Sequence, residues 1–206
     1  MKNKKILIIG AGIHGSFLAK YLSFHGFKIT ILEKNNDICS ETSAATHNRA
    51  NRGYHYPRSK KTFNECIKGY DFFKKNYRNF LKKITSFYCI EKKSNLNFSN
   101  YINFFKKNNL KFKVVKNSKY IHQKNIEGII KAEEGCFDHS KLKAYLKKKI
   151  SNKYVKIIFN FEIDKVKNTN GKICYYSRGG KKIIDDFDLI INCTYVYSQK
   201  ISKLFF

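Results

Sequence analysis

Short apolar runs alternate with helical spacings of apolar residues along the chain, and this alternation predicts an α/β protein. The first run, Ile6 to Ile9, has the length of a buried strand. Apolar residues at 17, 18, 21 and 22 then follow the spacing of one helix face, and a second apolar run occupies residues 27–32. The chain therefore opens with a predicted strand, helix and strand, the order of a β-α-β unit.

Beyond residue 34 the pattern predicts a polar loop and then mixed elements. Residues 35–60 are rich in polar side chains and contain the only proline, Pro57, so we expect a long loop that is functional or disordered. From Lys60 to Lys83 apolar residues recur at steps of three and four, which predicts an amphipathic helix. We expect an acidic turn at 133–138 and an Asn-Gly hairpin turn at 168–171. Shorter helices are expected at 100–107 and 141–150, and further strands at 87–91, 112–115, 154–166, 172–177 and 187–194.

Three glycines between the first strand and the helix follow the G-x-G-x-x-G spacing of dinucleotide-binding loops. In such a loop Gly10 permits a tight turn, and Gly12 allows the backbone to approach a pyrophosphate. Gly15 lets the helix pack closely on the strand, and N–H groups at the helix start face the phosphates. Glu33 ends the second strand, where a carboxylate can accept hydrogen bonds from a ribose diol. This acid disfavours an NADP site, which calls for a basic residue.

The charge of the chain is strongly positive. Its 206 residues include 42 lysines and arginines against 15 aspartates and glutamates, a formal net charge of +27, which invites a polyanion-binding interpretation. Only five of the basic residues are arginine, and the lysine excess together with abundant Asn, Ile and Phe is typical of codon bias in an AT-rich genome. We therefore expect a solvated lysine surface and no specific nucleic-acid partner.

Cysteine spacing and apolar run lengths indicate the compartment. The six cysteines show no C-x-x-C spacing, which predicts reduced thiols and no metal site. No apolar run approaches the roughly 20 residues of a membrane span. These features predict a cytoplasmic protein without a transmembrane segment.

Several segments after the glycine loop resemble flavoproteins of the D-amino acid oxidase superfamily. Residues 42–57 carry a Ser/Thr-rich stretch followed by an Asn and a Gly, as those proteins do close to their flavin. Residues 134–138 resemble their acid-Gly-x-x-Asp turn, and residues 189–194 resemble their strand beside the FAD. Residues 53–57, with the helix after them, look most like the L-2-hydroxyglutarate oxidase branch. Tyr195 departs from the pattern, since the family usually has glycine there.

The resemblance implies an FAD-dependent oxidoreductase and covers the N-terminal portion of such a protein. The implied fold is α/β: a Rossmann-like FAD-binding domain with the β-α-β start of the glutathione reductase type, joined to part of an α+β substrate-domain sheet. Residues 1–60 and 133–206 would form the FAD-binding part, and residues 61–132 a partial substrate or cap region. Because family members are longer, we expect a truncated product, a remnant, or one half of a split enzyme whose C-terminal half is separately encoded.

The resemblance also implies which residues would contact FAD. The glycines and the helix start would hold the pyrophosphate, Glu33 the adenosine ribose, and the polar loop the phosphates and the flavin edge. The backbone of a strand in the second half of the chain would contact the adenine. The expected cofactor-binding residues are Gly10, Gly12, Gly15, Glu33, Ser43, Thr46, His47, Asn48, Ile163 and Thr194.

The family oxidises C–N or C–O bonds by hydride transfer to flavin, so the resemblance implies a small amino or hydroxy acid as substrate. Arginine forks bind carboxylates, and Arg49, Arg52 and Arg58 cluster in a chain with little other arginine. His55 can accept a proton near neutral pH, which makes His55, Tyr54 and Arg52 the catalytic candidates. The alternatives are a catalytically inactive nucleotide-binding or interaction module left from such an enzyme, and a polyanion-binding protein.

Overall fold

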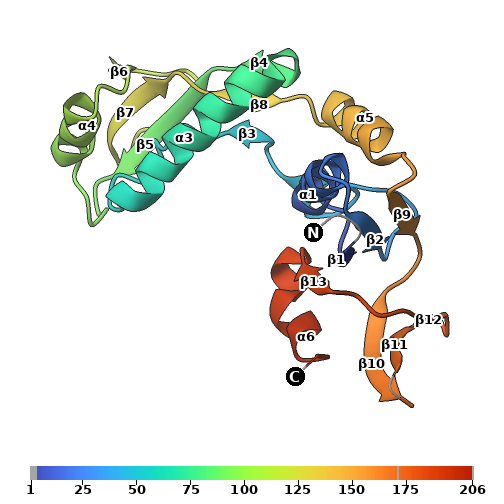
Figure 1. Cartoon of the computed structure of the whole chain (residues 1–206). Helices are drawn as coiled ribbons and strands as arrows, with labels where there is room; N and C mark the ends of the chain where they lie inside the picture. Colours follow the sequence, from blue (N-terminus) through green and yellow to red (C-terminus); the bar gives the residue numbers. More distant parts are fainter. Residues whose placement is uncertain (1–3, 171, 206) are drawn as a thin grey trace. The chain divides into compact units, whose positions relative to one another are not determined.

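The computed structural model describes residues 4–170 and 172–205, which divide into two compact units (Figure 1). The first unit contains the residues up to Thr46 and those from His139 onward, and the second contains residues 47–138. Residues 47–60 and 133–138, which we expected in the FAD-binding part, thus group with the second unit. The reason is strand pairing, because β8 (Gly135–Phe137) pairs with both β3 (Arg49–Ala50) and β4 (Leu81–Lys83).

The first unit is built on a parallel sheet with the strand order β13-β1-β2-β9, which confirms the α/β class. Its elements are β1 (Lys5–Ile9), α1 (Ile13–Phe24), β2 (Lys28–Leu32), α5 (His139–Ile150), β9 (Val155–Ile158) and β13 (Leu189–Asn192). The chain leaves β1 toward β2 on one side and returns with β13 on the other side. Open α/β sheets bind their ligands at such a switch point, outside the carboxyl ends of the strands.

The apolar run that predicts the first strand is buried, as expected for a parallel strand with neighbours on both sides. Ile8 lies in register beside Ile31 of β2 and Ile191 of β13. The helix that follows buries its small residues, including Gly15 and Ala19. Small side chains on this face bring the helix close to the sheet and fix the position of its N-terminus.

A three-stranded antiparallel sheet lies between β9 and β13 in the sequence. It consists of β10 (Ile163–Thr169), β11 (Lys172–Ser177) and β12 (Lys182–Ile184). Asn170 has a φ of +52°, as an Asn-Gly hairpin turn requires, and the predicted Gly171 lies outside the described residues. After β13 the chain forms η2 (Tyr195–Tyr197) and α6 (Ser198–Ser202). One core joins these parts; its buried members are Leu7, Ile9, Leu32, Phe161, Ile163, Tyr175 and Ile201.

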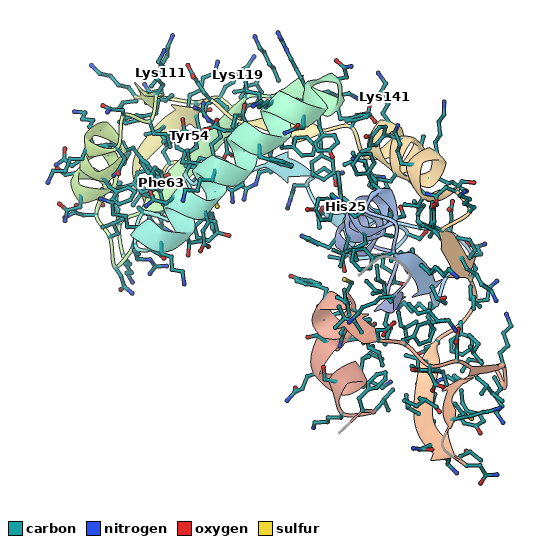
Figure 2. All side chains as sticks on the ribbon, viewed as in Figure 1. His25, Tyr54, Phe63, Lys111, Lys119 and Lys141 are labelled. Carbon is teal, nitrogen blue, oxygen red and sulfur yellow. The ribbon has the colours of Figure 1, made fainter. Side chains whose placement is uncertain are left out.

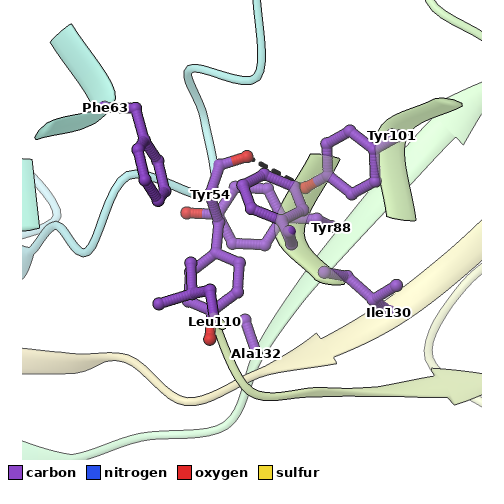
Figure 3. Close-up of a cluster of buried hydrophobic side chains, with 8 residues drawn as sticks. Tyr54, Phe63, Tyr88, Tyr101, Leu110, Ile130 and Ala132 are labelled. Carbon is purple, nitrogen blue, oxygen red and sulfur yellow. Dashed lines mark hydrogen bonds between the residues drawn. The ribbon is translucent and has the colours of Figure 1, made fainter. Parts of the chain in front are cut away.

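The second unit combines helices with a three-stranded antiparallel sheet of order β5-β7-β6. Its remaining elements are α3 (Lys60–Tyr77), η1 (Arg78–Phe80), β5 (Ser86–Glu91), α4 (Phe98–Lys107), β6 (Phe112–Val115) and β7 (Ile126–Ala132). The helix α3 begins where Ser59 caps it, since the Ser59 side chain accepts a hydrogen bond from the Thr62 N–H. An aromatic core that includes Tyr54, Phe63 and Tyr101 fills the unit (Figure 3).

Two predicted elements of this unit are wrong in their extent. The helix expected over residues 60–83 ends at Tyr77, and residues 81–83 form β4 because their backbone bonds to β8. Residues 133–138, expected as a turn, contain β8 itself. The strand β7 was not expected, because a glycine and charged residues interrupt its apolar positions.

Candidate functional site

The carboxyl ends of β1, β2 and β13 meet at one edge of the parallel sheet, which we call the cofactor edge. The glycine loop leaves β1 at this edge and leads into α1. Gly10 has a φ of +98°, and its N–H donates to the Leu32 carbonyl at 2.8 Å. The turn predicted from the first glycine is therefore present, and it connects the ends of β1 and β2 directly.

The three glycines differ in what surrounds them. A Cβ added to Gly15 would lie 2.0 Å from the Gly10 carbonyl oxygen, and one added to Gly10 would lie 2.9 Å from the Cys193 carbonyl oxygen. Both positions therefore require glycine for packing. Gly12 is the N-cap of α1 in an ordinary extended conformation, and a Cβ there would meet only the Ser43 Oγ, at 3.4 Å. Its backbone is thus open to an approaching ligand, as a pyrophosphate contact needs.

Glu33 is buried beside this loop at the end of β2. One carboxylate oxygen accepts a hydrogen bond from the Ala11 N–H at 2.7 Å, and the other accepts from the Asn35 N–H at 2.9 Å. These bonds hold the carboxylate against the glycine loop. A carboxylate has about four lone-pair positions, so Glu33 retains capacity to accept from ribose hydroxyls.

Ser43 lies at the start of α1 although thirty residues separate it from Ile13 in the sequence. Its hydroxyl accepts a hydrogen bond from the Ile13 N–H at 3.1 Å. The short helix α2 (Thr42–Ala45) carries Ser43, and the Thr46 N–H donates to the Thr42 carbonyl at its end. Ser43 therefore stands where a helix N-terminus attracts phosphate oxygens.

At the end of β13, Asn192 organises the turn that contains Thr194. The Asn192 Oδ1 accepts from both the Thr194 N–H, at 3.1 Å, and the Thr194 hydroxyl, at 2.6 Å. Its amide donates to the Ser198 carbonyl at 2.8 Å. Asn192 thereby holds Thr194 beside the Gly10 turn.

Tyr195, at the position where the resembling family usually has glycine, adopts a φ of +51°. This left-handed conformation costs a residue with a Cβ about 1–2 kcal/mol. The Tyr195 side chain is 70 % exposed, so it recovers little of this cost by burial. Backbone geometry thus explains why glycine suits the position.

Replacing Tyr195 by glycine is expected to raise the free energy of unfolding by about 0.5–1 kcal/mol, since relief of strain exceeds the added entropy of the unfolded chain. Urea unfolding followed by circular dichroism measures the change. Tyr197→Gly is the matched control, because the φ of Tyr197 is −94°. The control should lose stability, and a loss in both variants would contradict the strain argument.

Ile163 is buried in the core of the first unit, at the start of β10. Its side chain therefore packs among apolar neighbours, and any adenine contact would involve the backbone. The preceding Glu162 carbonyl accepts from the Arg178 N–H at 2.8 Å.

Two expected cofactor residues, His47 and Asn48, begin the second unit. The His47 side chain is exposed. Asn48 has a φ of +51°, and its carbonyl accepts from the Phe137 N–H at 2.8 Å, next to the β3–β8 pair. A contact of either residue with FAD stays a prediction.

A polar network within the second unit joins the buried Tyr88 and Glu134 to the exposed Arg49 and the half-buried Arg52. The Tyr88 hydroxyl donates to one Glu134 carboxylate oxygen at 2.8 Å, and the backbone N–H of Arg52 donates to the other at 2.9 Å. Arg49 Nη1 donates to the Tyr88 hydroxyl at 3.0 Å. Burial and the bond to Glu134 raise the pKa of Tyr88, so its hydroxyl stays protonated and donates. Tyr88 could not be predicted from local spacing, because 46 residues separate it from Glu134.

The three catalytic candidates occupy different environments in this unit. Tyr54 is fully buried, its hydroxyl donates to the Lys111 carbonyl, and its own carbonyl accepts from the Tyr101 hydroxyl at 2.9 Å (Figure 3). His55 is exposed, with its ring centroid 6.4 Å from that of Tyr88. The Arg52 guanidinium lies 4.9 Å from the Tyr70 ring centroid. Arg58, the third arginine of the sequence cluster, is exposed.

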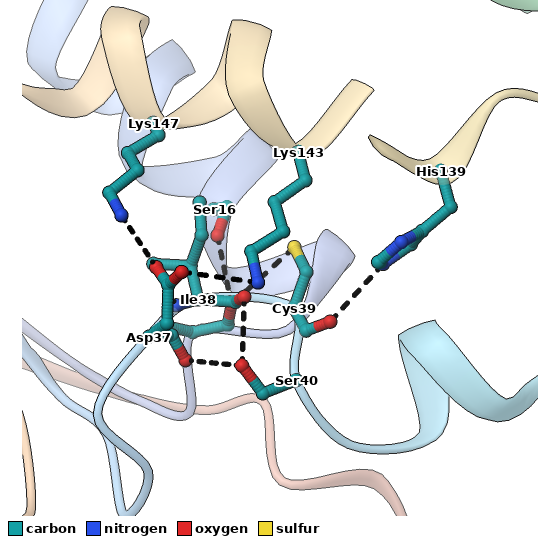
Figure 4. A network of polar contacts seen from close by, with 9 residues as sticks. Ser16, Asp37, Ile38, Cys39, Ser40, His139, Lys143 and Lys147 are labelled. Carbon is teal, nitrogen blue, oxygen red and sulfur yellow. Dashed lines mark hydrogen bonds and ion pairs between the residues drawn. The ribbon is translucent and has the colours of Figure 1, made fainter. Parts of the chain in front are cut away.

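A separate polar network ties α5 to the segment after β2 (Figure 4). Asp37 forms ion pairs with Lys143 at 3.2 Å and Lys147 at 3.0 Å, and a ring nitrogen of His139 lies 3.2 Å from the Cys39 carbonyl oxygen. Burial raises the pKa of the Cys39 thiol, which keeps it protonated. These contacts position the loop that leads to α2. In the described part of the chain, no group of three or more His, Cys, Asp or Glu side chains could hold a metal ion.

A glycine loop at the switch point of a parallel sheet, with a buried acid after the second strand, defines a dinucleotide-binding protein. The family model described as FAD dependent oxidoreductase (DAO) matches residues 5–205. The chain therefore belongs to this family, which confirms the expected superfamily and its cofactor, FAD. No curated protein matches the chain.

Solved structures share the fold. Glycine oxidase from Geobacillus kaustophilus matches with a TM-score of 0.71 and 10 % identity, covering 100 % of this chain and 59 % of its own. L-Proline dehydrogenase from P. horikoshii matches with a TM-score of 0.69 and 16 % identity, and the match covers 98 % of this chain and 56 % of the dehydrogenase. L-α-Glycerophosphate oxidase from Mycoplasma pneumoniae, with FAD bound, matches with a TM-score of 0.63 and 19 % identity. The match covers 92 % of this chain and 53 % of the oxidase. The chain thus spans little more than half the length of these proteins.

Proposed function

We propose that this chain binds FAD at the cofactor edge and forms the N-terminal part of an oxidase or dehydrogenase for a small amino or hydroxy acid. The observation that carries the proposal is the joint placement of Gly12 and Glu33. Gly12 leaves the start of α1 open to a pyrophosphate, and two backbone N–H groups hold the Glu33 carboxylate beside it. Family membership supports FAD as the dinucleotide.

Each residue of the cofactor edge would then have one task. The α1 N-terminus and Ser43 would hold phosphate oxygens, Glu33 would accept from the ribose, and Thr194 would line the end of β13. FAD, when bound, supplies the hydride acceptor.

The arginines of the second unit support a carboxylate-bearing substrate. Arg49 Nη1 donates to the Tyr88 hydroxyl and Arg52 Nη1 donates to the Glu133 carbonyl, so each guanidinium is held by a hydrogen bond. A guanidinium held in this way can bind a carboxylate through parallel hydrogen bonds. The exposed His55 is the candidate proton acceptor. The resemblance of residues 53–57 supports an L-2-hydroxyglutarate oxidase-like substrate within this class.

The remaining part of the enzyme is proposed to be a separately encoded C-terminal half, in a cytoplasmic setting. The second candidate function is an inactive nucleotide-binding or interaction module. Tyr195 supports considering it, because a bulky residue in the left-handed conformation occupies the position where the resembling family usually has glycine.

Gly12→Ala is expected to weaken FAD binding about 100-fold or more, because a methyl group displaces the pyrophosphate from its charge-assisted hydrogen bonds. Flavin fluorescence titration of the purified chain measures the dissociation constant. The melting temperature should stay unchanged, since Gly12 has ordinary backbone angles and an added Cβ would meet only the Ser43 Oγ, at 3.4 Å.

Gly179→Ala is the control for this test, because Gly179 lies in the same unit and an added Cβ would meet only the Ser177 Oγ, at 3.9 Å. Equal FAD affinity in Gly12→Ala and the unmodified chain would contradict the assigned pyrophosphate site. Absence of FAD uptake by the unmodified chain would overturn the proposed function and favour an interaction module that binds no FAD.

A further inference from the structure

The two helices α1 and α5 present a basic surface without acidic residues. α1 contains one lysine and α5 contains five, and neither helix contains an aspartate or glutamate. The helices contact one another through the Tyr145 ring, whose centroid lies 5.5 Å from Lys20 Nζ and 5.8 Å from Lys149 Nζ. Asp37 pairs with Lys143 and Lys147 on the side of α5 that faces the loop after β2. The lysines at the C-terminal end of α5 therefore add to a positive potential.

The C-terminal ends of both helices lie at the same edge of the parallel sheet. α1 connects the parallel strands β1 and β2, so it runs back along them and ends near their amino ends. α5 leads in the same way into β9, which is parallel to β2. This amino edge is opposite the cofactor edge, so a partner bound there leaves the cofactor edge accessible.

Large aromatic side chains are exposed at this end of α1. Phe24 is 86 % exposed and Tyr21 is 62 % exposed. The His25 ring, labelled in Figure 2, contacts both, with centroid distances of 5.4 Å to Phe24 and 4.5 Å to Tyr21. Tyr154, before β9, is also exposed and lies 5.2 Å from Lys153 Nζ. An exposed aromatic group of this kind marks an interaction surface.

Tyr154 and several lysines line a shallow hollow at the amino edge. Its wall includes Lys28, Lys153, Lys156 and Lys5. Asp185 also lines the hollow, where it is paired with Lys5 at 2.6 Å, and the Lys5 N–H donates to Asp188 at 2.7 Å. We call the exposed set at this edge the amino-edge patch; its members are Tyr21, Phe24, His25, Lys28, Lys149, Lys153, Tyr154 and Lys156.

We propose that the amino-edge patch docks the protein peripherally on a membrane surface of anionic phospholipids. Aromatic rings such as Phe24 and Tyr21 insert favourably at the level of the lipid headgroups, and lysines beside them attract anionic lipid. The hollow lined by Lys28 and Lys153 suits a headgroup phosphate. The patch contains no arginine, the residue whose planar fork nucleic-acid sites use most, so a lipid surface fits its chemistry better than DNA or RNA.

Docking needs no membrane-spanning element. Within residues 4–170 and 172–205, no helix is long and apolar enough to cross a bilayer. Binding would instead combine a small apolar insertion with electrostatic attraction, as in other peripheral proteins.

Co-sedimentation of the purified whole chain with lipid vesicles tests the proposal. The chain should bind phosphatidylcholine vesicles that contain phosphatidylserine, and vesicles of phosphatidylcholine alone should bind it far more weakly. The double variant Tyr21→Ser/Phe24→Ser should reduce the partition coefficient about tenfold or more, because two interfacial rings are lost. Lys149→Glu/Lys153→Glu should reduce it by a similar factor at low salt.

Control variants make the same chemical changes in the second unit. Tyr120 is 76 % exposed and Phe72 is 61 % exposed, so Phe72→Ser/Tyr120→Ser matches the aromatic test variant, and Lys116→Glu/Lys119→Glu matches the lysine variant in charge. These controls should bind vesicles as the unmodified chain does, and all variants should keep its melting temperature.

Three outcomes would overturn the proposal. The first is equal binding to vesicles with and without phosphatidylserine. The second is unchanged binding of Tyr21→Ser/Phe24→Ser. The third is an equal loss in the test and control lysine variants together with complete competition by duplex DNA, which would assign the binding to the net charge of the whole chain.

Discussion

Gly15→Ala is expected to lower the free energy of unfolding of the first unit by about 3 kcal/mol or more, the upper range for overpacking a buried site. An added Cβ would lie 2.0 Å from the Gly10 carbonyl oxygen, while the Cys193 Cβ blocks the other side at 3.4 Å. The Gly10 backbone cannot shift freely, because its N–H is bonded to the Leu32 carbonyl. Relief of the clash must therefore separate α1 from the ends of β1 and β13.

Urea unfolding by circular dichroism measures this loss, and hydrogen exchange shows whether it is confined to the first unit. Peptides from β1 and β2 should lose protection, whereas those from β5 and β7 should keep it. Gly69→Ala is the control, because Gly69 is exposed in α3 with open space around it and should gain up to about 1 kcal/mol. A melting temperature of Gly15→Ala equal to that of the unmodified chain would contradict the close approach of helix and strand.

Glu134→Ala is expected to destabilise the second unit by about 3 kcal/mol. Glu134 is buried and accepts hydrogen bonds from the Tyr88 hydroxyl and the backbone N–H of Arg52. Its removal leaves both donors without this acceptor, and each buried unsatisfied group costs about 1–3 kcal/mol. The same measurements apply, with loss of protection now expected in β5 and β7.

The neighbouring Glu133 provides a matched control for this prediction. Its carboxylate lies 3.7 Å from Arg52 Nη1, and its side chain is 62 % exposed, so Glu133→Ala should change stability by less than about 1 kcal/mol. Tyr88→Phe keeps the ring and removes one donor, and it should cost about 1 kcal/mol. Similar losses in Glu133→Ala and Glu134→Ala would show that the network contributes little.

The glycine loop is the part of the site that local sequence predicts best. Gly10, Gly12 and Gly15 belong to one short segment whose strand and helix are set by apolar spacing, and the structure has both elements there. Glu33 follows as the end of the next strand. All of these positions depend on neighbours within about thirty residues of sequence, and so their arrangement can be read from the chain directly.

The bounds of the helices and strands in the second unit could not be predicted from local sequence. Residues 81–83 continue a helical spacing, yet they become β4 because β8 supplies backbone partners from more than fifty residues away. Tyr54 belongs to a polar stretch, yet it is fully buried because helices and strands from residues 60 to 132 enclose it. Long-range pairing outweighed the local pattern in both cases.

From its amino acids alone, this chain specifies an α/β start, a dinucleotide loop and an acid for the ribose, because each depends on periodicity and spacing over short distances. The packing that makes Gly10 indispensable comes from Cys193, which follows β13 at the far end of the chain, whereas Gly15 is enclosed mainly by the Gly10 carbonyl of its own loop. The same holds for the Arg49–Tyr88–Glu134 network and for the aromatic rings and lysines of the amino-edge patch. Such groups meet only when strands pair and helices pack, since no local spacing encodes a contact between distant segments.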